Sequence, residues 1–198
     1  MKIKNKINYK KLIKDSFSNH ISTINDTFFE TEKKVDKASE IISKSLKSGG
    51  TIFWCGNGGS AADSQHIAAE FVGRYKKDRR PLKSIALTTD TSIITCISND
   101  YSYEKIFSRQ LAALGSRGDV LIVISTSGES ENIRQVLMQA KKMKIKTIGL
   151  LGKKGGRCKP FVNIPLVVPS QSTARIQEAH ILIEHLICEL VELKLGFN

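Results

Sequence analysis

The feature that most limits the possible folds is an apolar run near the middle of the chain. Residues 119–125, Asp-Val-Leu-Ile-Val-Ile-Ser, contain five consecutive aliphatic residues between Asp119 and Ser125. Such a run is typical of a strand in a parallel sheet, because helices cover both faces of that sheet. The run is short and is bounded by glycine and polar residues, which favours a strand over a helix. The sequence therefore predicts the central strand of an α/β fold.

Four further short apolar runs alternate with helical patterns along the chain. Regular alternation of this kind predicts a three-layer, doubly wound sheet of five parallel strands, with the strand order of flavodoxin-like folds. The other expected strands are 51–55, 84–88, 147–151 and 164–168, and the expected helices are about 60–73, 103–114, 129–143 and 173–194.

The first 48 residues come before this alternation and read as two extra N-terminal helices. Ile13, Phe17, Ile21, Ile24 and Phe28 recur at spacings of three and four, which gives one apolar stripe on a helix. A second helix is expected over about 32–47, because glycines follow it at 49 and 50. The stripe predicts a subunit contact. The chain is thus expected to be a single domain, with oligomerisation helices over 1–48 and an α/β core over 49–198.

Composition excludes several classes of protein. The 198 residues suit one domain, and the four cysteines are far apart, with no CxxC pair. This spacing argues against a disulfide scaffold or a structural zinc cluster and fits a reducing compartment. The N-terminus lacks the apolar segment of a signal peptide, and no apolar run is long enough to span a bilayer. We therefore expect a cytoplasmic protein without a membrane partner.

The formal net charge of +12 raises the question of nucleic-acid binding. The lysines and arginines lie in several separated segments, without interleaved aromatic residues or helix-turn-helix spacing. This distribution favours solvated surfaces and no nucleic-acid partner. The same charge would attract small anionic ligands.

Two polar loops follow expected strands and open expected helices. Residues 56–60, Gly-Asn-Gly-Gly-Ser, allow the backbone to approach a ligand closely. They match neither the dinucleotide fingerprint GxGxxG nor the Walker pattern GxxxxGK[ST]. Residues 125–130, Ser-Thr-Ser-Gly-Glu-Ser, bring four hydroxyls to a helix N-terminus, whereas capping alone requires one. Hydroxyls, free N–H groups and the helix dipole together predict a phosphate cradle.

Several motifs in order resemble a known family. The chain contains CGNGGSAAD at 55–63, HIAAEF at 66–71, GRY at 73–75, ISND at 97–100, FSRQ at 107–110, GDVLIVISTSGES at 118–130 and RIQEAH at 175–180. From about residue 49 onward this series is similar to the phosphoheptose isomerase (sedoheptulose 7-phosphate isomerase) family of SIS-domain proteins.

The resemblance implies an aldose–ketose isomerase that converts D-sedoheptulose 7-phosphate to D-glycero-D-manno-heptose 7-phosphate. This reaction is the first step of nucleotide-activated heptose biosynthesis for surface glycans. The resemblance also implies a homo-oligomer, as a tetramer, and one Zn²⁺ per subunit. Glu70 and His185 would be the catalytic acid/base groups. The metal ligands would be His66, Glu70, Gln177 and His185, and the substrate contacts would be Asn57, Gly58, Gly59, Glu70, Asn99, Asp100, Ser125, Thr126, Ser127, Ser130 and Gln177.

The spacing of two of these residues bears on assembly. Gln177 and His185 are eight residues apart, about 12 Å along one helix. They would reach one metal most easily from different subunits, or if Gln177 preceded the helix proper. His180 is expected to be structural or to support the site residues from behind them.

Three other functions remain open from the residues. They are a non-catalytic SIS protein that binds a replication initiator, an isomerase of another sugar phosphate, and a DNA-binding regulator with an SIS domain. Retention of both Glu70 and His185 favours an enzyme over a scaffold. Residues 1–50 offer no helix-turn-helix for the regulator.

Overall fold

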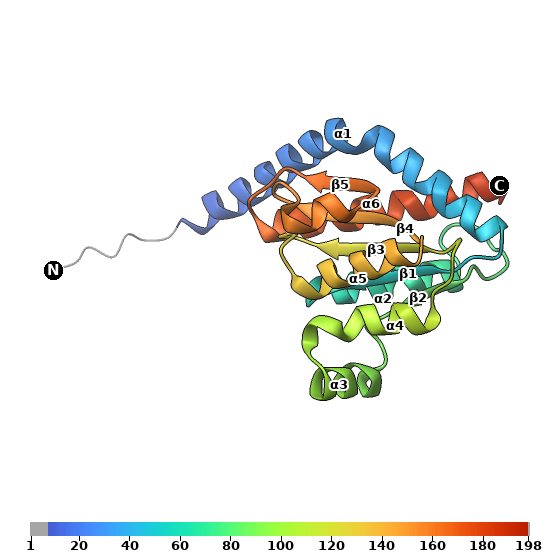
Figure 1. Cartoon of the computed structure of the whole chain (residues 1–198). Helices are drawn as coiled ribbons and strands as arrows, with labels where there is room; N and C mark the ends of the chain where they lie inside the picture. The colour runs from blue at the N-terminus through green and yellow to red at the C-terminus, as the bar shows by residue number, and fades with distance from the viewer. Residues whose placement is uncertain (1–7, 198) are drawn as a thin grey trace.

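The computed structural model describes residues 8–197, which form a five-stranded sheet with helices on both faces (Figure 1). All strands pair in parallel, in the order β2-β1-β3-β4-β5, so the order reverses between β1 and β3. The predicted five-stranded α/β fold is therefore confirmed, with its strongest apolar run at the centre. The strands are β1 (Ile52–Gly56), β2 (Ser84–Ala86), β3 (Val120–Ser125), β4 (Lys146–Gly152) and β5 (Ile164–Val168).

The side chains of β3 explain its continuous apolar sequence. Val120, Ile122 and Ile124 point to one face of the sheet and pack in a cluster with residues of α1, α2 and α6. Leu121 and Val123 point to the other face and pack with residues of α4 and α5. The helices are α1 (Tyr9–Lys47), α2 (Gly59–Val72), α3 (Thr91–Asp100), α4 (Ile106–Leu114), α5 (Glu131–Lys142) and α6 (Thr173–Leu195), with short 3-10 turns η1 (Tyr103–Lys105) and η2 (Gly156–Phe161).

The N-terminal region differs from the prediction, because one helix replaces the expected two. The single helix α1 has 39 residues and begins at Tyr9, after the N-cap Asn8, whose side chain accepts a hydrogen bond from the Lys11 backbone. No glycine or proline occurs within α1, so nothing in the sequence stops the helix between its two halves. The helix instead runs on from its exposed first half into a second half whose side chains, such as Ala38 and Ile42, are buried in the core.

Helix α3 is the other difference, since no helix was predicted there. Its sequence mixes threonine, serine and isoleucine, and only Ile97 is buried. An apolar stripe is therefore missing, and that stripe is the main sequence signal for a helix. Figure 1 shows α3 projecting from the rest of the molecule beneath α4.

The apolar stripe of α1 is largely uncovered. Ile13, Phe17, Ile21 and Phe28 are each more than half exposed, whereas Ile24 packs against the core. The first half of α1 extends past the sheet in Figure 1. Its second half borders an apolar groove of about 560 Å³ between α1 and α6.

Among the described helices, none is both long and apolar enough to cross a bilayer.

Candidate active site

The two polar loops meet at the carboxyl ends of β1 and β3, which are neighbours in the sheet. Asn57 follows β1, and its Nδ2 donates to Oδ1 of Asn132 at 2.9 Å. Asn132 returns a hydrogen bond from its Nδ2 to Oδ1 of Asn57 at 2.8 Å, and the Tyr103 hydroxyl donates to the same oxygen at 2.9 Å. The glycine loop after β1 and the start of the helix that follows the serine loop are therefore joined by side-chain hydrogen bonds. Asn132 and Tyr103 were not among the predicted site residues, although the amide of Asn132, two residues after the serine loop, was a usable signal.

The glycine loop is shaped by one positive φ angle and one close approach. Gly58 has φ of 57° and precedes α2, a conformation that favours glycine. A Cβ at Gly59 would collide with the side-chain amide of Gln177. That amide donates from Nε2 to Oδ2 of Asp63 at 3.2 Å. Burial raises the pKa of Asp63, against the opposing effect of this hydrogen bond. The loop, α2 and the start of α6 are thus held together.

The serine loop has the features expected of a phosphate cradle. The hydroxyl oxygens of Ser125 and Ser127 accept hydrogen bonds from the backbone N–H groups of Gly128 and Glu129, both at 3.1 Å. Each hydroxyl keeps its own hydrogen for donation to a ligand. Ser130 is the N-cap of α5, yet its side chain makes no capping hydrogen bond. Thr126 is partly buried beside these residues.

The candidate proton-transfer groups meet where α2 packs against α6. His66 and Glu70 lie one turn apart on α2, with 3.8 Å between Nε2 and Oε1. The Nε2 atoms of His66 and His185 are 3.0 Å apart, although 119 residues separate them in sequence. One of these two imidazole nitrogens donates and the other accepts. The structure therefore brings His66, Glu70 and His185 together.

The side chains of His66, Glu70 and His185 offer nitrogen and oxygen atoms that could bind a metal ion. Within residues 8–197, no three His, Cys, Asp or Glu side chains are grouped so as to hold a metal ion. Zinc nevertheless accepts nitrogen and oxygen donors, and two nitrogens bound to one tetrahedral zinc lie about 3.3 Å apart. The 3.0 Å between His66 and His185 is close to that separation. The donor types suit zinc, whereas the Gln177 amide is engaged with Asp63 instead.

Two other predicted substrate residues lie at the end of α3. Asn99 donates from Nδ2 to Oδ1 of Asp100 at 2.9 Å, and both side chains are exposed. Oδ2 of Asp100 accepts a weak hydrogen bond from the Cys96 thiol at 3.5 Å. In the described part of the chain, no hydrogen bond links Asn99 or Asp100 to the two loops.

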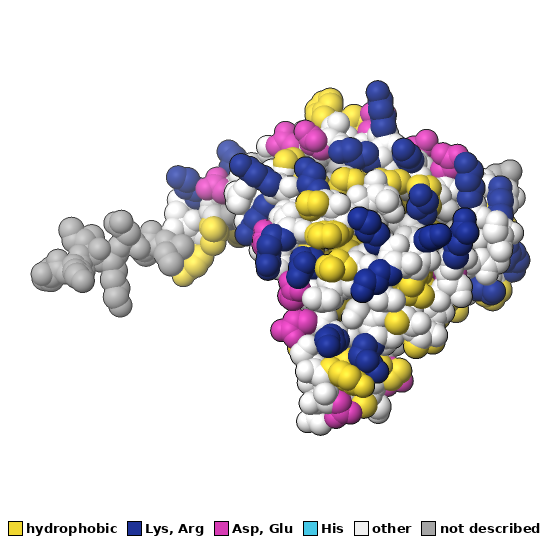
Figure 2. All heavy atoms as spheres, viewed as in Figure 1, with side chains coloured by type: hydrophobic (Ala, Val, Ile, Leu, Met, Phe, Trp, Pro, Cys, Tyr) yellow, Lys and Arg dark blue, Asp and Glu magenta, His cyan; other side chains and the backbone are white. Residues whose placement is uncertain are grey.

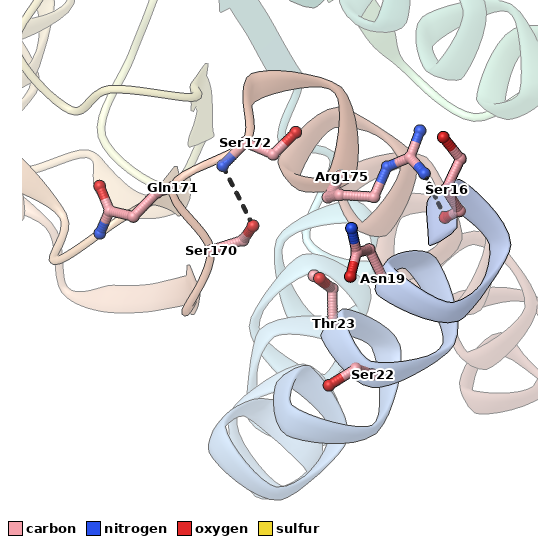
Figure 3. Close-up of a pocket in the computed structure, with 8 residues that line it drawn as sticks. All are labelled: Ser16, Asn19, Ser22, Thr23, Ser170, Gln171, Ser172 and Arg175. Atoms are coloured by element: carbon pink, nitrogen blue, oxygen red, sulfur yellow. Dashed lines mark hydrogen bonds between the residues drawn. The ribbon is translucent and has the colours of Figure 1, made fainter. Parts of the chain in front are cut away.

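Arg175, two residues before Gln177, points away from the loops toward α1. Its guanidinium donates to the Ser16 carbonyl at 2.6 Å and to Oε1 of Glu178 at 2.5 Å. Arg175 lines a polar hollow of about 420 Å³ between α1 and the segment that precedes α6 (Figure 3). The remaining residues around this hollow are Ser16, Asn19, Ser22, Thr23, Ser170, Gln171 and Ser172.

Helix α6 also buries two titratable side chains beneath the site. Burial lowers the pKa of His180 to about 4. Burial, with a smaller effect of the Asp63 carboxylate, raises the pKa of Glu184 to about 8. Both groups are therefore uncharged at neutral pH, which agrees with the expected structural role of His180.

Comparison with known proteins identifies the family. A family model described as the SIS domain matches residues 16–152. A phosphoheptose isomerase of Aliarcobacter butzleri is 51% identical over 187 residues, which cover 94% of this chain and 99% of that protein. The structure of a phosphoheptose isomerase from Neisseria gonorrhoeae superposes with a TM-score of 0.89 at 38% identity, over 94% of this chain and 100% of that one. The structure of a phosphoheptose isomerase from Francisella tularensis superposes with a TM-score of 0.91 at 35% identity, over 94% of this chain and 100% of that one. With this fold, these loops and these relatives, the chain belongs to the phosphoheptose isomerase family of SIS-domain proteins.

Proposed function

We propose that the protein interconverts D-sedoheptulose 7-phosphate and D-glycero-D-manno-heptose 7-phosphate, as the entry step to nucleotide-activated heptoses for surface glycans. The observation that carries this proposal is the meeting of Glu70, His66 and His185 at the α2–α6 contact. Relatives that match almost the full chain and are named phosphoheptose isomerases support the substrate.

The reaction moves one proton between adjacent carbons through an enediol. The Glu70 carboxylate takes a proton from C1 of the ketose, and the C–H electrons form the C1–C2 double bond. His185 gives a proton to the carbonyl oxygen on C2. To complete the aldose, the C1 hydroxyl loses its proton to His185, and Glu70 returns its proton to C2. Groups in such roles typically contribute about 10²–10⁴-fold each.

The serine loop would hold the other end of the substrate. The hydroxyls of Ser125, Thr126, Ser127 and Ser130 would donate to the phosphate at the N-terminus of α5, where the helix dipole favours an anion. Asn57, Gly58 and Gly59 would contact the sugar between the two ends. Anchoring the phosphate fixes which carbons face Glu70. Asn99 and Asp100 are proposed as further substrate contacts.

We include a zinc ion in the proposal, with His66, Glu70, Gln177 and His185 as its ligands. When bound, the ion would polarise the substrate carbonyl. In the present arrangement Gln177 would have to leave Asp63 to join the other three side chains. Glu70 would serve best as a base while only weakly bound to metal, because tight coordination lowers its basicity.

We also propose a homo-oligomer, as a tetramer in the cytoplasm, with residues 1–48 as the assembly segment and 49–198 as the catalytic core. The exposed side chains of Phe17, Ile21 and Phe28 support this assembly, as does the apolar groove beside Leu182 and Leu186. An apolar surface of this extent on a monomer would favour aggregation. Figure 2 shows lysine and arginine side chains spread over the face in view, and this positive charge would attract an anionic sugar phosphate.

The decisive experiment is incubation of the purified protein with sedoheptulose 7-phosphate while the aldoheptose 7-phosphate is monitored. Arabinose 5-phosphate and fructose 6-phosphate serve as competing substrates. Formation of the aldoheptose, with much slower conversion of the other two, is expected. Binding of the heptose phosphate without turnover would instead favour a non-catalytic SIS protein.

A further inference from the structure

Residues 73–80, which connect α2 to the segment before β2, are fastened to α6 by one buried carboxylate. We call these residues the 73–80 strap. Oε1 of Glu192 accepts from the Tyr75 backbone at 3.0 Å and from Nε of Arg79 at 2.9 Å. Oε2 accepts from the backbone of Lys76 at 3.0 Å and of Lys77 at 3.2 Å. One side chain of α6 therefore holds the strap at four points.

The buried carboxylate remains charged at neutral pH. Burial opposes ionisation of Glu192, but the Tyr75, Lys76 and Arg79 donors overcome it and lower the pKa of Glu192 below its ordinary value. Arg79 and Glu192 have side chains only 2% and 3% exposed. A pair so buried is costly unless its remaining hydrogen-bonding atoms are satisfied. Here they are satisfied, so the pair forms a rigid attachment.

The same arginine also holds the end of the helix that carries Glu70. Arg79 donates from NH2 to the Glu70 carbonyl at 2.8 Å and from NH1 to the Phe71 carbonyl at 2.9 Å. These carbonyls belong to the last turn of α2, which contains no basic residue of its own. Arg79 therefore joins the backbone of Glu70 to Glu192 on α6.

The strap places one aromatic ring against a catalytic group. The Tyr75 ring stacks on the His185 imidazole, with 5.5 Å between ring centroids and an interplanar angle of 15°. His66 meets the same imidazole from another direction, at an interplanar angle of 83°. His185 and Glu192 are two helical turns apart on α6, so they lie on one face of that helix. Glu192, which anchors the strap, therefore lies on the same side of α6 as the His185 imidazole, which Tyr75 of the strap contacts.

We propose that Tyr75 is a positioning residue for His185 and that the Arg79–Glu192 pair holds Tyr75 in place. The stacked ring restricts rotation of the His185 imidazole, so that its Nε2 faces Nε2 of His66, which in turn neighbours Glu70. The strap also fixes the last turn of α2 against α6, which sets the distance between the two proton-transfer groups. This inference rests on the proposed isomerase function.

The test compares Tyr75→Phe, which keeps a flat ring, with Tyr75→Leu, which keeps apolar bulk without one. Tyr75→Phe should retain wild-type kcat. Tyr75→Leu should lose about tenfold or more in kcat, since small misplacements of a catalytic group are costly. KM should stay within about twofold, because the serine loop binds the phosphate independently. Equal kcat in both variants would overturn the proposal.

A second measurement does not depend on turnover. Proteins with ¹³C-labelled histidine should give a His185 ring resonance shifted by the ring current of residue 75. The shift should persist in Tyr75→Phe and disappear in Tyr75→Leu, and the His185→Gln spectrum assigns the signal. An unchanged His185 signal in Tyr75→Leu would refute the stacking. If the wild type is inactive on sedoheptulose 7-phosphate, the proposed function fails, while this spectrum still tests the strap.

The role of the anchor is tested with Glu192→Gln, whose amide group cannot accept hydrogen bonds at both ends. If Glu192 acts through Tyr75, the kcat losses of Glu192→Gln and Tyr75→Leu should not multiply in the double variant. Fully multiplicative losses would contradict the coupling. Circular dichroism identifies any failure of Glu192→Gln to fold, and in that case the two Tyr75 variants decide the proposal.

Discussion

The imidazoles of His66 and His185 meet edge to face, with 3.0 Å between their Nε2 atoms and 5.3 Å between their ring centroids. This contact joins α2 to α6 and brings His185 toward Glu70, whose Oε1 lies 3.8 Å from Nε2 of His66. Two of the groups needed for proton transfer between carbons, a carboxylate and an imidazole, therefore share one location.

Replacement of either proton-transfer group should slow the chemical step. Glu70→Gln and His185→Gln keep approximate size but remove the titratable group, so each should lower kcat by about 10²-fold or more. Solvent deuterium exchange into C1 and C2 should fall in parallel. Glu40→Gln, on the exposed surface of α1, is the matched control and should leave kcat unchanged. Full turnover in Glu70→Gln would remove Glu70 as the base.

A role confined to metal binding predicts a different result for the same variants. Loss of zinc would then accompany loss of activity, and excess metal would partly restore it. Metal content measured by mass spectrometry, with and without added zinc, distinguishes this role from proton transfer.

Ser130 offers the cleanest test of the phosphate cradle. Its hydroxyl makes no capping hydrogen bond, so Ser130→Ala should leave the free energy of unfolding nearly unchanged. Loss of a hydrogen bond to a charged phosphate should weaken substrate binding by about 1–3 kcal/mol. Calorimetry with inorganic phosphate and with the substrate measures this effect. Ser108→Ala on α4 is the control, and equal loss in both variants would argue against the cradle.

The exposed stripe of α1 should hold subunits together. Phe17→Glu and Phe28→Glu each place a charge where an apolar contact is expected, so both should shift the oligomer toward smaller species. Light scattering coupled to gel filtration measures the mass. Lys44→Glu, on an exposed face later in α1, should keep the wild-type mass. A wild-type protein that is monomeric at micromolar concentration would rule out the assembly.

Burial of His180 should make stability depend on pH. Its folded-state pKa of about 4 lies below the ordinary value of 6.5. Between these values the unfolded chain binds one more proton than the folded chain, so this residue's contribution to stability falls as the pH drops from 6.5 toward 4. The full shift corresponds to about 3 kcal/mol as an upper limit. The difference in urea unfolding free energy between wild type and His180→Gln should therefore shrink from pH 7 to pH 5. A difference that stays constant would show that His180 does not titrate in this way.

Local patterns in the sequence predicted the sheet and the two loops. A strand with five aliphatic residues in a row buries both of its faces when helices cover both sides of the sheet. Strand β3, Val120–Ser125, is buried along its whole length in this way. The same local reasoning divided α1 into two helices, because the apolar stripe at 13–28 and the helical stretch at 32–47 were treated as separate elements. Without glycine or proline, the backbone of α1 continues through that change.

The sequence alone determined which residue types stand at the ends of β1 and β3, and the family resemblance pointed to Glu70 on α2 and His185 on α6. Only the tertiary structure decided the contacts between distant segments: Asn57 with Asn132, His66 with His185, and Glu192 with the 73–80 strap. The physical reason is that strand and loop preferences depend on neighbours a few residues away. Pairs separated by 75 to 119 residues are set instead by strand order and helix packing, which no local pattern records.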